Sequence, residues 1–269
     1  MGISASSWIA KKEIIAACII TLIMAFMDIS GLPAALFVNV EILDITPFYF
    51  TLMVNFLIIG IVFILGWKLF YPKWTFGLEW SKTGNELVKY GLAGILALAA
   101  SFFAFYIGLQ PFDNSPTLAK VLIEGFIYYI GVGIVEELYV RGLLLNIIEK
   151  FFNGKKEATL YAILLSSVIF GLGHIFGILG SSILTITCKV TWTIGLGIYL
   201  GAVYKKTNSL WNAIILHIVI DFCGVPFCFS SSSSYPEISL WIILPVYLLL
   251  GAYGIYIMLK EKENLNSNL

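Results

Sequence analysis

Three groups of polar and aromatic residues lie inside hydrophobic runs of this chain, and each group has the spacing of one helical turn. They are Glu136-Glu137 with Arg141, Phe170 with His174, and His217 with Asp221. Ionisable groups at membrane depth cost roughly 2.5–3.5 kcal/mol each on insertion scales. A chain that places carboxylates, imidazoles and a guanidinium there is therefore expected to use them for chemistry.

Helical spacing predicts which of these side chains meet. Glu137 and Arg141 are four residues apart, so they share a face and can form an ion pair. Glu136 lies about 100° further around the same helix and needs another partner. Glu136 is therefore the carboxylate available for chemistry, with His174 and His217 as its expected neighbours.

This residue set can support hydrolysis. A carboxylate and an imidazole that hold one water form a general base for attack on a carbonyl. His217, with Asp221 on the same face, can face a developing oxyanion if it donates a hydrogen bond. Glu136, His174 and His217 are also the ligand types of some catalytic zinc sites, although the chain has no His-Glu-x-x-His motif. The residues alone thus indicate an intramembrane hydrolase or a polar transport site.

The composition predicts the elements that carry these residues. Hydrophobic residues make up 59% of the chain and charged residues 12%, which is typical of a multi-span membrane protein. We expect an all-α polytopic protein with about eight transmembrane helices around a polar chamber, as a single domain over 1–269. The predicted runs are 14–38, 46–70, 86–109, 117–149, 158–179, 183–204, 208–229 and 238–260.

Lysine placement predicts the orientation. With the N-terminus in the cytoplasm, every inside connection is basic and the outside connections hold only Lys120, at the start of a span. The positive-inside rule then places both termini in the cytoplasm. Segment 71–85 is expected to lie at the membrane interface, and Lys189 is expected to snorkel from its span. The zero net charge gives no indication of nucleic-acid binding.

The predicted spans bring the polar groups to overlapping depths. At the helical rise, Glu136 lies about 21 Å from the cytoplasmic end of its run and His174 about 25 Å. On the same basis, His217 and Asp221 lie about 13 and 20 Å deep. Their convergence favours one shared site over independent structural polar residues.

The three motifs, in this order on successive spans, resemble the CPBP family of CAAX proteases and bacteriocin-processing enzymes, also called the Abi family. The resemblance covers 117–229, which would form the catalytic core. It implies an intramembrane endopeptidase of the glutamic type, with a catalytic chamber open toward the cytoplasm.

The resemblance also implies roles for individual residues. Glu136 and His174 would activate water, and His217 and Asp221 would lie on the oxyanion side. The remaining two motif residues, Glu137 and Arg141, would shape and charge-balance the site. One departure stands out: prenyl-protein proteases of the family carry Asn where this chain has Asp221. An ionised Asp only accepts hydrogen bonds, so Asp221 would have to be protonated or orient His217.

The substrate and its route stay open at this stage. A prenylated CAAX tail or a membrane or secreted peptide could be cleaved, entering from the membrane or from the cytoplasmic side. No cofactor is expected, with zinc held by Glu136, His174 and His217 as the alternative. A non-catalytic bacteriocin-immunity or scaffold protein is the alternative from another class. Membrane lipid is the expected surrounding, in a prokaryotic plasma membrane.

Overall fold

The structure is a computed structural model that describes residues 5–30, 47–80, 84–108, 118–155, 157–229 and 236–267. All regular elements within these ranges are helical, as the sequence predicts. They are α1 (Ala5–Ser30), α3 (Pro47–Phe70), α4 (Asn85–Gly108), α5 (Leu118–Glu137), the π-helical segment η2 (Leu138–Leu145), α6 (Asn146–Phe151), α7 (Ala158–Gly173), the 3-10 segment η3 (His174–Ile178), α8 (Ile183–Thr207), α9 (Leu210–Asp221), the 3-10 segment η4 (Phe222–Phe229) and α10 (Glu237–Ser267).

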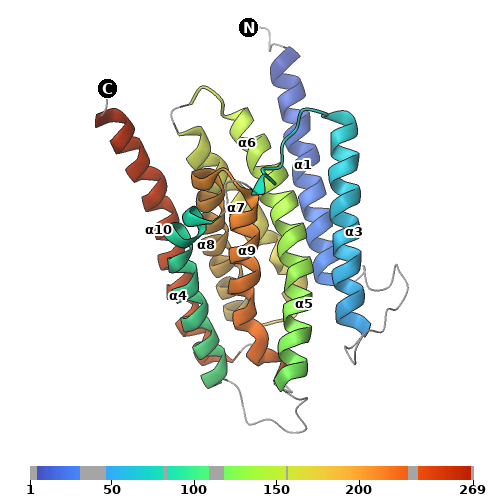
Figure 1. The fold of residues 1–269 in the computed structure, drawn as a ribbon, viewed down its shortest axis with the longest axis vertical. Coiled ribbons are helices and arrows are strands. Elements are labelled where there is room, and N and C mark those ends of the chain that lie inside the picture. Colours follow the sequence, from blue (N-terminus) through green and yellow to red (C-terminus); the bar gives the residue numbers. More distant parts are fainter. Residues whose placement is uncertain are drawn as a thin grey trace.

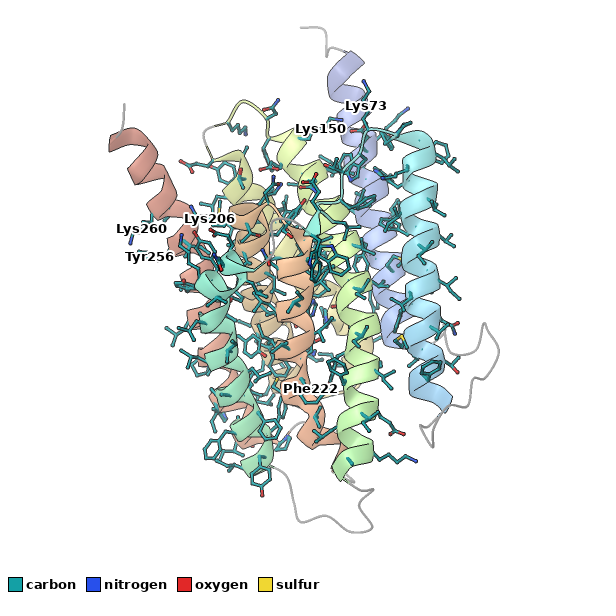
Figure 2. The ribbon with its side chains drawn as sticks, viewed as in Figure 1. Lys73, Lys150, Lys206, Phe222, Tyr256 and Lys260 are labelled. Atoms are coloured by element: carbon teal, nitrogen blue, oxygen red, sulfur yellow. The ribbon has the colours of Figure 1, made fainter. Side chains whose placement is uncertain are left out.

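The long helices run side by side and alternate in direction, so that α1 begins and α10 finishes at the same end of the bundle (Figure 1). Lys73, Lys150, Lys206 and Lys260 lie at this end, which we call the lysine end (Figure 2). Consecutive helices joined by short connections have to alternate in this way. The shared end of α1 and α10 agrees with the predicted topology, and the side of the membrane that this end faces remains a prediction.

The chain is an integral membrane protein, since several of its helices are long and apolar enough to cross a bilayer. Among the described residues, five helices meet the length and hydropathy needed: 50–70, 85–107, 158–178, 183–207 and 237–260. The predicted count of eight crossings is not confirmed. Helix α5 carries Lys120, Glu124 and the Glu136–Glu137 pair within 20 residues, and the apolar part of the α9 region is shorter.

The fourth predicted run, 117–149, is helical without a break from Leu118 onward, with a π-helical stretch in its second half. All eight residues of η2 are buried. The carbonyl of Gly142 within it accepts hydrogen bonds from the Asn146 side chain and from the indole of Trp74, both at 3.0 Å. A π turn changes which residues face a neighbouring helix and often marks a functional site. Here it follows directly after Glu137.

Small residues bring α8 close to α10. A Cβ atom added to Gly195 would lie 2.3 Å from the carbonyl oxygen of Tyr247, and one added to Gly251 would lie 3.0 Å from the Cα of Gly195. Close approach of two backbones at glycine is a common way to pack helices in membranes, where van der Waals contact drives association. This contact fixes α8, which contributes one wall of the site described below.

Candidate active site

Glu137 and Arg141 form a fully buried ion pair at the junction of α5 and η2. The Arg141 Nη1 donates to Glu137 Oε1 at 2.6 Å, and the two side chains are 1% and 0% exposed. Arg141 also donates from Nη2 to the carbonyl of Gly197 at 3.3 Å and lies over the ring of Phe170 at 5.0 Å. The predicted pairing is confirmed, and it ties η2 to α7 and α8.

Glu137 has a second partner that helical spacing alone does not indicate. His217 Nδ1 lies 2.6 Å from Glu137 Oε1, the same oxygen that accepts from Arg141. A carboxylate oxygen held by a guanidinium accepts hydrogen bonds, so His217 donates from Nδ1. Glu137 thereby orients the imidazole that the third motif brings from α9.

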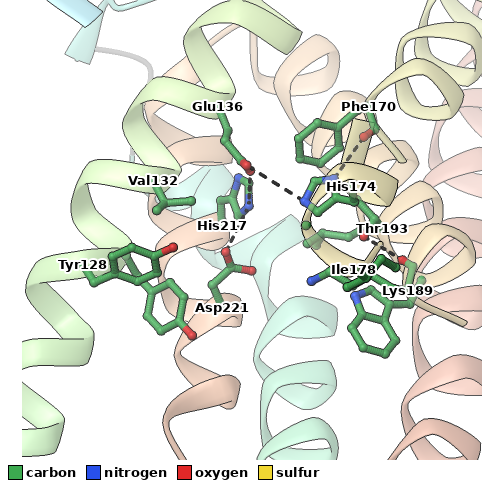
Figure 3. Close-up of a pocket in the computed structure, with 14 residues that line it drawn as sticks. Tyr128, Val132, Glu136, Phe170, His174, Ile178, Lys189, Thr193, His217 and Asp221 are labelled. Atoms are coloured by element: carbon green, nitrogen blue, oxygen red, sulfur yellow. Dashed lines mark hydrogen bonds and ion pairs between the residues drawn. The ribbon is translucent and has the colours of Figure 1, made fainter. Parts of the chain in front are cut away.

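Glu136 points away from this pair and lies between the two histidines, as its angular position predicts (Figure 3). Its Oε2 is 3.4 Å from His217 Nε2, and its Oε1 is 4.0 Å from His174 Nε2. The Glu136 side chain is only 5% exposed. Residues from α5, η3 and α9 thus converge on one site, as the sequence predicts.

The orientation of His174 follows from its own backbone. Its Nδ1 lies 3.0 Å from the carbonyl oxygen of Phe170, and a carbonyl can only accept, so Nδ1 carries the proton. The ring of Phe170 packs edge-on against it, with centroids 4.6 Å apart. In a neutral imidazole, Nε2 is then left with a lone pair that faces Glu136.

This arrangement suits one water molecule. The 4.0 Å between His174 Nε2 and Glu136 Oε1 is longer than a direct hydrogen bond and fits two acceptors that share a bridging water. Such a water would donate one hydrogen to each acceptor and would keep its oxygen lone pairs available for attack.

Asp221 lies near Nε2 of His217, whereas Glu137 contacts Nδ1 on the other side of the ring. Its Oδ2 is 3.3 Å from His217 Nε2, the atom that also faces Glu136. An ionised carboxylate can only accept hydrogen bonds, so, if both carboxylates are ionised, His217 donates from Nδ1 to Glu137 and from Nε2 toward Asp221. Of the two roles considered for Asp221, orientation of His217 fits this contact.

The cluster lines a cavity of about 300 Å³ between α5, α7–η3, α8 and α9. Lys189 lines the same cavity, with its Nζ 5.0 Å from the centroid of the Trp192 ring. The sequence reading placed Lys189 as a snorkelling residue, because nothing in its own span marks it as part of a polar site. Tyr128 and Trp192 also line the cavity, and both are aromatic residues that spacing cannot separate from ordinary core.

The part of the chain that the structure describes holds no group of three or more His, Cys, Asp or Glu side chains placed to bind a metal ion. Of the zinc ligand set considered above, Glu136 lies 3.4 Å from His217 Nε2 and 4.0 Å from His174 Nε2. Removal of zinc with a chelator is the measurement that tests this alternative.

Comparison with known proteins gives one family and one negative result. Residues 118–223 match the family model described as type II CAAX prenyl endopeptidase Rce1-like. No curated protein matches the chain. The matched segment begins at α5 and extends past Asp221, so it contains all three motifs. Within residues 118–223, therefore, the chain carries a domain of the Rce1-like CAAX protease family, which is the CPBP resemblance that the motifs predict.

Proposed function

We propose that the chain is an intramembrane endopeptidase of the glutamic type, in which Glu136 and His174 activate a water molecule for attack on a peptide carbonyl. The observation that carries this proposal is the position of the Glu136 carboxylate between two imidazoles from different helices, in a cavity inside the bundle. The family match supports a protease in general.

In the proposed mechanism, the water donates one hydrogen bond to Glu136 and one to the lone pair on His174 Nε2. Glu136 takes the proton as the oxygen attacks. The Nε2–H of His217, which faces Asp221 and Glu136 in the free site, becomes the donor to the developing oxyanion, and the contact with Glu137 holds the ring in place. Glu136 then delivers the proton to the leaving amine.

The membrane orientation of the chain and the bounds of its catalytic core are also inferred. We infer eight crossings in a single transmembrane domain, with 117–229 as the catalytic core and the lysine end in the cytoplasm of a prokaryotic cell. The described lysines at the ends of α3, α6 and α8 support this orientation, since cytoplasmic loops carry an excess of Lys and Arg. Both chain ends would then be cytoplasmic, with membrane lipid around the bundle.

The test compares peptide termini in membranes of cells that make the unaltered protein, Glu136→Gln, or Glu124→Gln. Glu124 is a matched control, since it is buried on the same helix, 3.9 Å from Lys120 and outside the cavity. Loss of a general base lowers the rate by about 10²–10⁴-fold. We expect a set of termini that disappears only with Glu136→Gln, and this set would identify the substrate.

Identical termini in all three membranes, with the protein's cellular effect unchanged, would sink the enzymatic proposal. That result would favour a non-catalytic immunity or scaffold protein that binds a membrane partner.

A further inference from the structure

Most of the cavity lining beyond the reacting groups lies toward one end of the bundle. Helices α5 and α8 begin at the end of the bundle opposite the lysine end, and α7–η3 finishes there (Figure 1). On α5 the lining residues precede Glu136, on η3 they follow His174, and on α8 they run from Lys189 up to Leu196. Tyr128, Ile178 and Lys189 accordingly lie on the same side of Glu136 (Figure 3). All three walls therefore lead away from the lysine end.

Exposure of the site side chains increases in the same direction. Glu136 is 5% exposed and His217 2%, whereas Asp221, one helical turn further along α9, is 25% exposed. His174, at the start of η3, is 14% exposed, and Gly177 further along η3 is exposed. The mouth of the cavity thus lies beside the end of η3.

The lysine end of the site is covered. Trp74 donates to the carbonyl of Gly142 in η2, and a Cβ added to Gly142 would lie 2.8 Å from the ring of Phe76. The carbonyl of Gly77 accepts from the backbone of Leu210 at the start of α9, at 2.7 Å. Residues 71–80, the first part of the segment 71–85 that was expected to lie at the interface, therefore pack over the junction of η2 and α9.

We propose that the peptide substrate reaches Glu136 from the end opposite the lysine end, which lies outside the cytoplasm in the proposed orientation. The substrate class is then an exported or membrane-anchored peptide whose scissile segment emerges at the extracytoplasmic face, rather than the tail of a cytosolic protein. This inference rests on the proposed hydrolysis at Glu136, and it differs from the cytoplasmic access that the family resemblance implies.

The test uses single cysteines in the full-length protein in intact cells, with a membrane-impermeant maleimide. Ser181→Cys and Asn153→Cys form a matched pair, since both residues are exposed and stand in the loops at the two ends of α7–η3. The unaltered chain serves as the blank for native cysteines, of which Cys188 and Cys223 are buried. We expect Ser181→Cys to react in intact cells and Asn153→Cys to react only after permeabilisation.

A second readout tests the mouth itself. Gly177 lines the cavity and has no left-handed backbone conformation that a cysteine would strain. External modification of Gly177→Cys is expected to stop cleavage, compared with the same variant before modification. Tyr128→Cys, at another position of the cavity lining, replaces it if Gly177→Cys fails to fold.

The outcomes separate the two proposals. Reversed labelling, or modification of both cavity cysteines without loss of cleavage, would overturn extracytoplasmic access and leave hydrolysis at Glu136 intact. Persistent cleavage by Glu136→Gln would instead overturn the proposed hydrolysis at Glu136.

Discussion

Replacement of Arg141 by Met is expected to destabilise the bundle strongly, because it removes the guanidinium from the buried Glu137 carboxylate and leaves that carboxylate with the His217 contact. The two side chains are 1% and 0% exposed and lie 2.6 Å apart. Removal of one partner from such a pair costs about 3–5 kcal/mol. The cation–π contact of Arg141 with Phe170 adds about 0.5–2 kcal/mol, although the two contributions need not be additive.

The double variant Glu137→Gln/Arg141→Met is expected to regain most of this loss. A neutral amide needs no buried cation, and its oxygen can still accept from His217 Nδ1. Replacing a buried ion pair by uncharged residues of similar size is often neutral or stabilising. A double-mutant cycle over Glu137 and Arg141 should therefore give a coupling energy on the order of 2–4 kcal/mol.

The assay is equilibrium unfolding of the purified protein in mixed micelles, followed by circular dichroism. Lys150→Met provides a control, because Lys150 pairs with Glu13 at 3.4 Å while 57% exposed. Exposed pairs contribute about 0.2–1 kcal/mol, so this variant should unfold almost as the unaltered protein does. If Arg141→Met cost no more than Lys150→Met, the reasoning from burial would be refuted.

Three further predictions concern the site and its support. Asp221→Asn should keep most of the cleavage activity, whereas Asp221→Leu should lower kcat by about 10²–10³-fold, and equal rates for the two variants would exclude a polar role for Asp221. Dialysis against EDTA should leave cleavage unchanged; a loss that Zn²⁺ restores would support the zinc alternative. Gly195→Ala should destabilise by about 1–3 kcal/mol because its Cβ would overlap Tyr247. Gly66→Ala is its control in the same unfolding assay, since a Cβ there meets no atom within 4 Å.

Local spacing was enough to predict the contacts within each motif. The four-residue interval predicts the pairs Glu137–Arg141 and His217–Asp221, and both are present. The angle between consecutive residues predicts that Glu136 faces elsewhere, and it does face the histidines. These predictions hold because they depend only on the regular spacing and angle of residues along one helix.

Contacts between helices were less accessible from the sequence. The bond from His217 to Glu137 and the position of Lys189 depend on how α8 and α9 are rotated about their axes. A helix that is hydrophobic all round carries no polar face from which that rotation can be deduced. The π-helical segment η2 escaped prediction for a related reason, since its Gly142 carbonyl accepts a hydrogen bond from Trp74, which is distant in the sequence.

The balance of charge in the cavity is itself an argument for catalysis. Arg141 pairs with Glu137, which leaves Glu136 and Asp221 as two further carboxylates beside Nε2 of His217. A buried ion pair contributes little net stability compared with well-packed apolar residues, so a purely structural bundle gains nothing from holding three carboxylates around one imidazole. The proposed hydrolase would gain, since Glu136 as the base and the Nε2–H of His217 as a donor would lie 3.4 Å apart beside the reacting carbonyl.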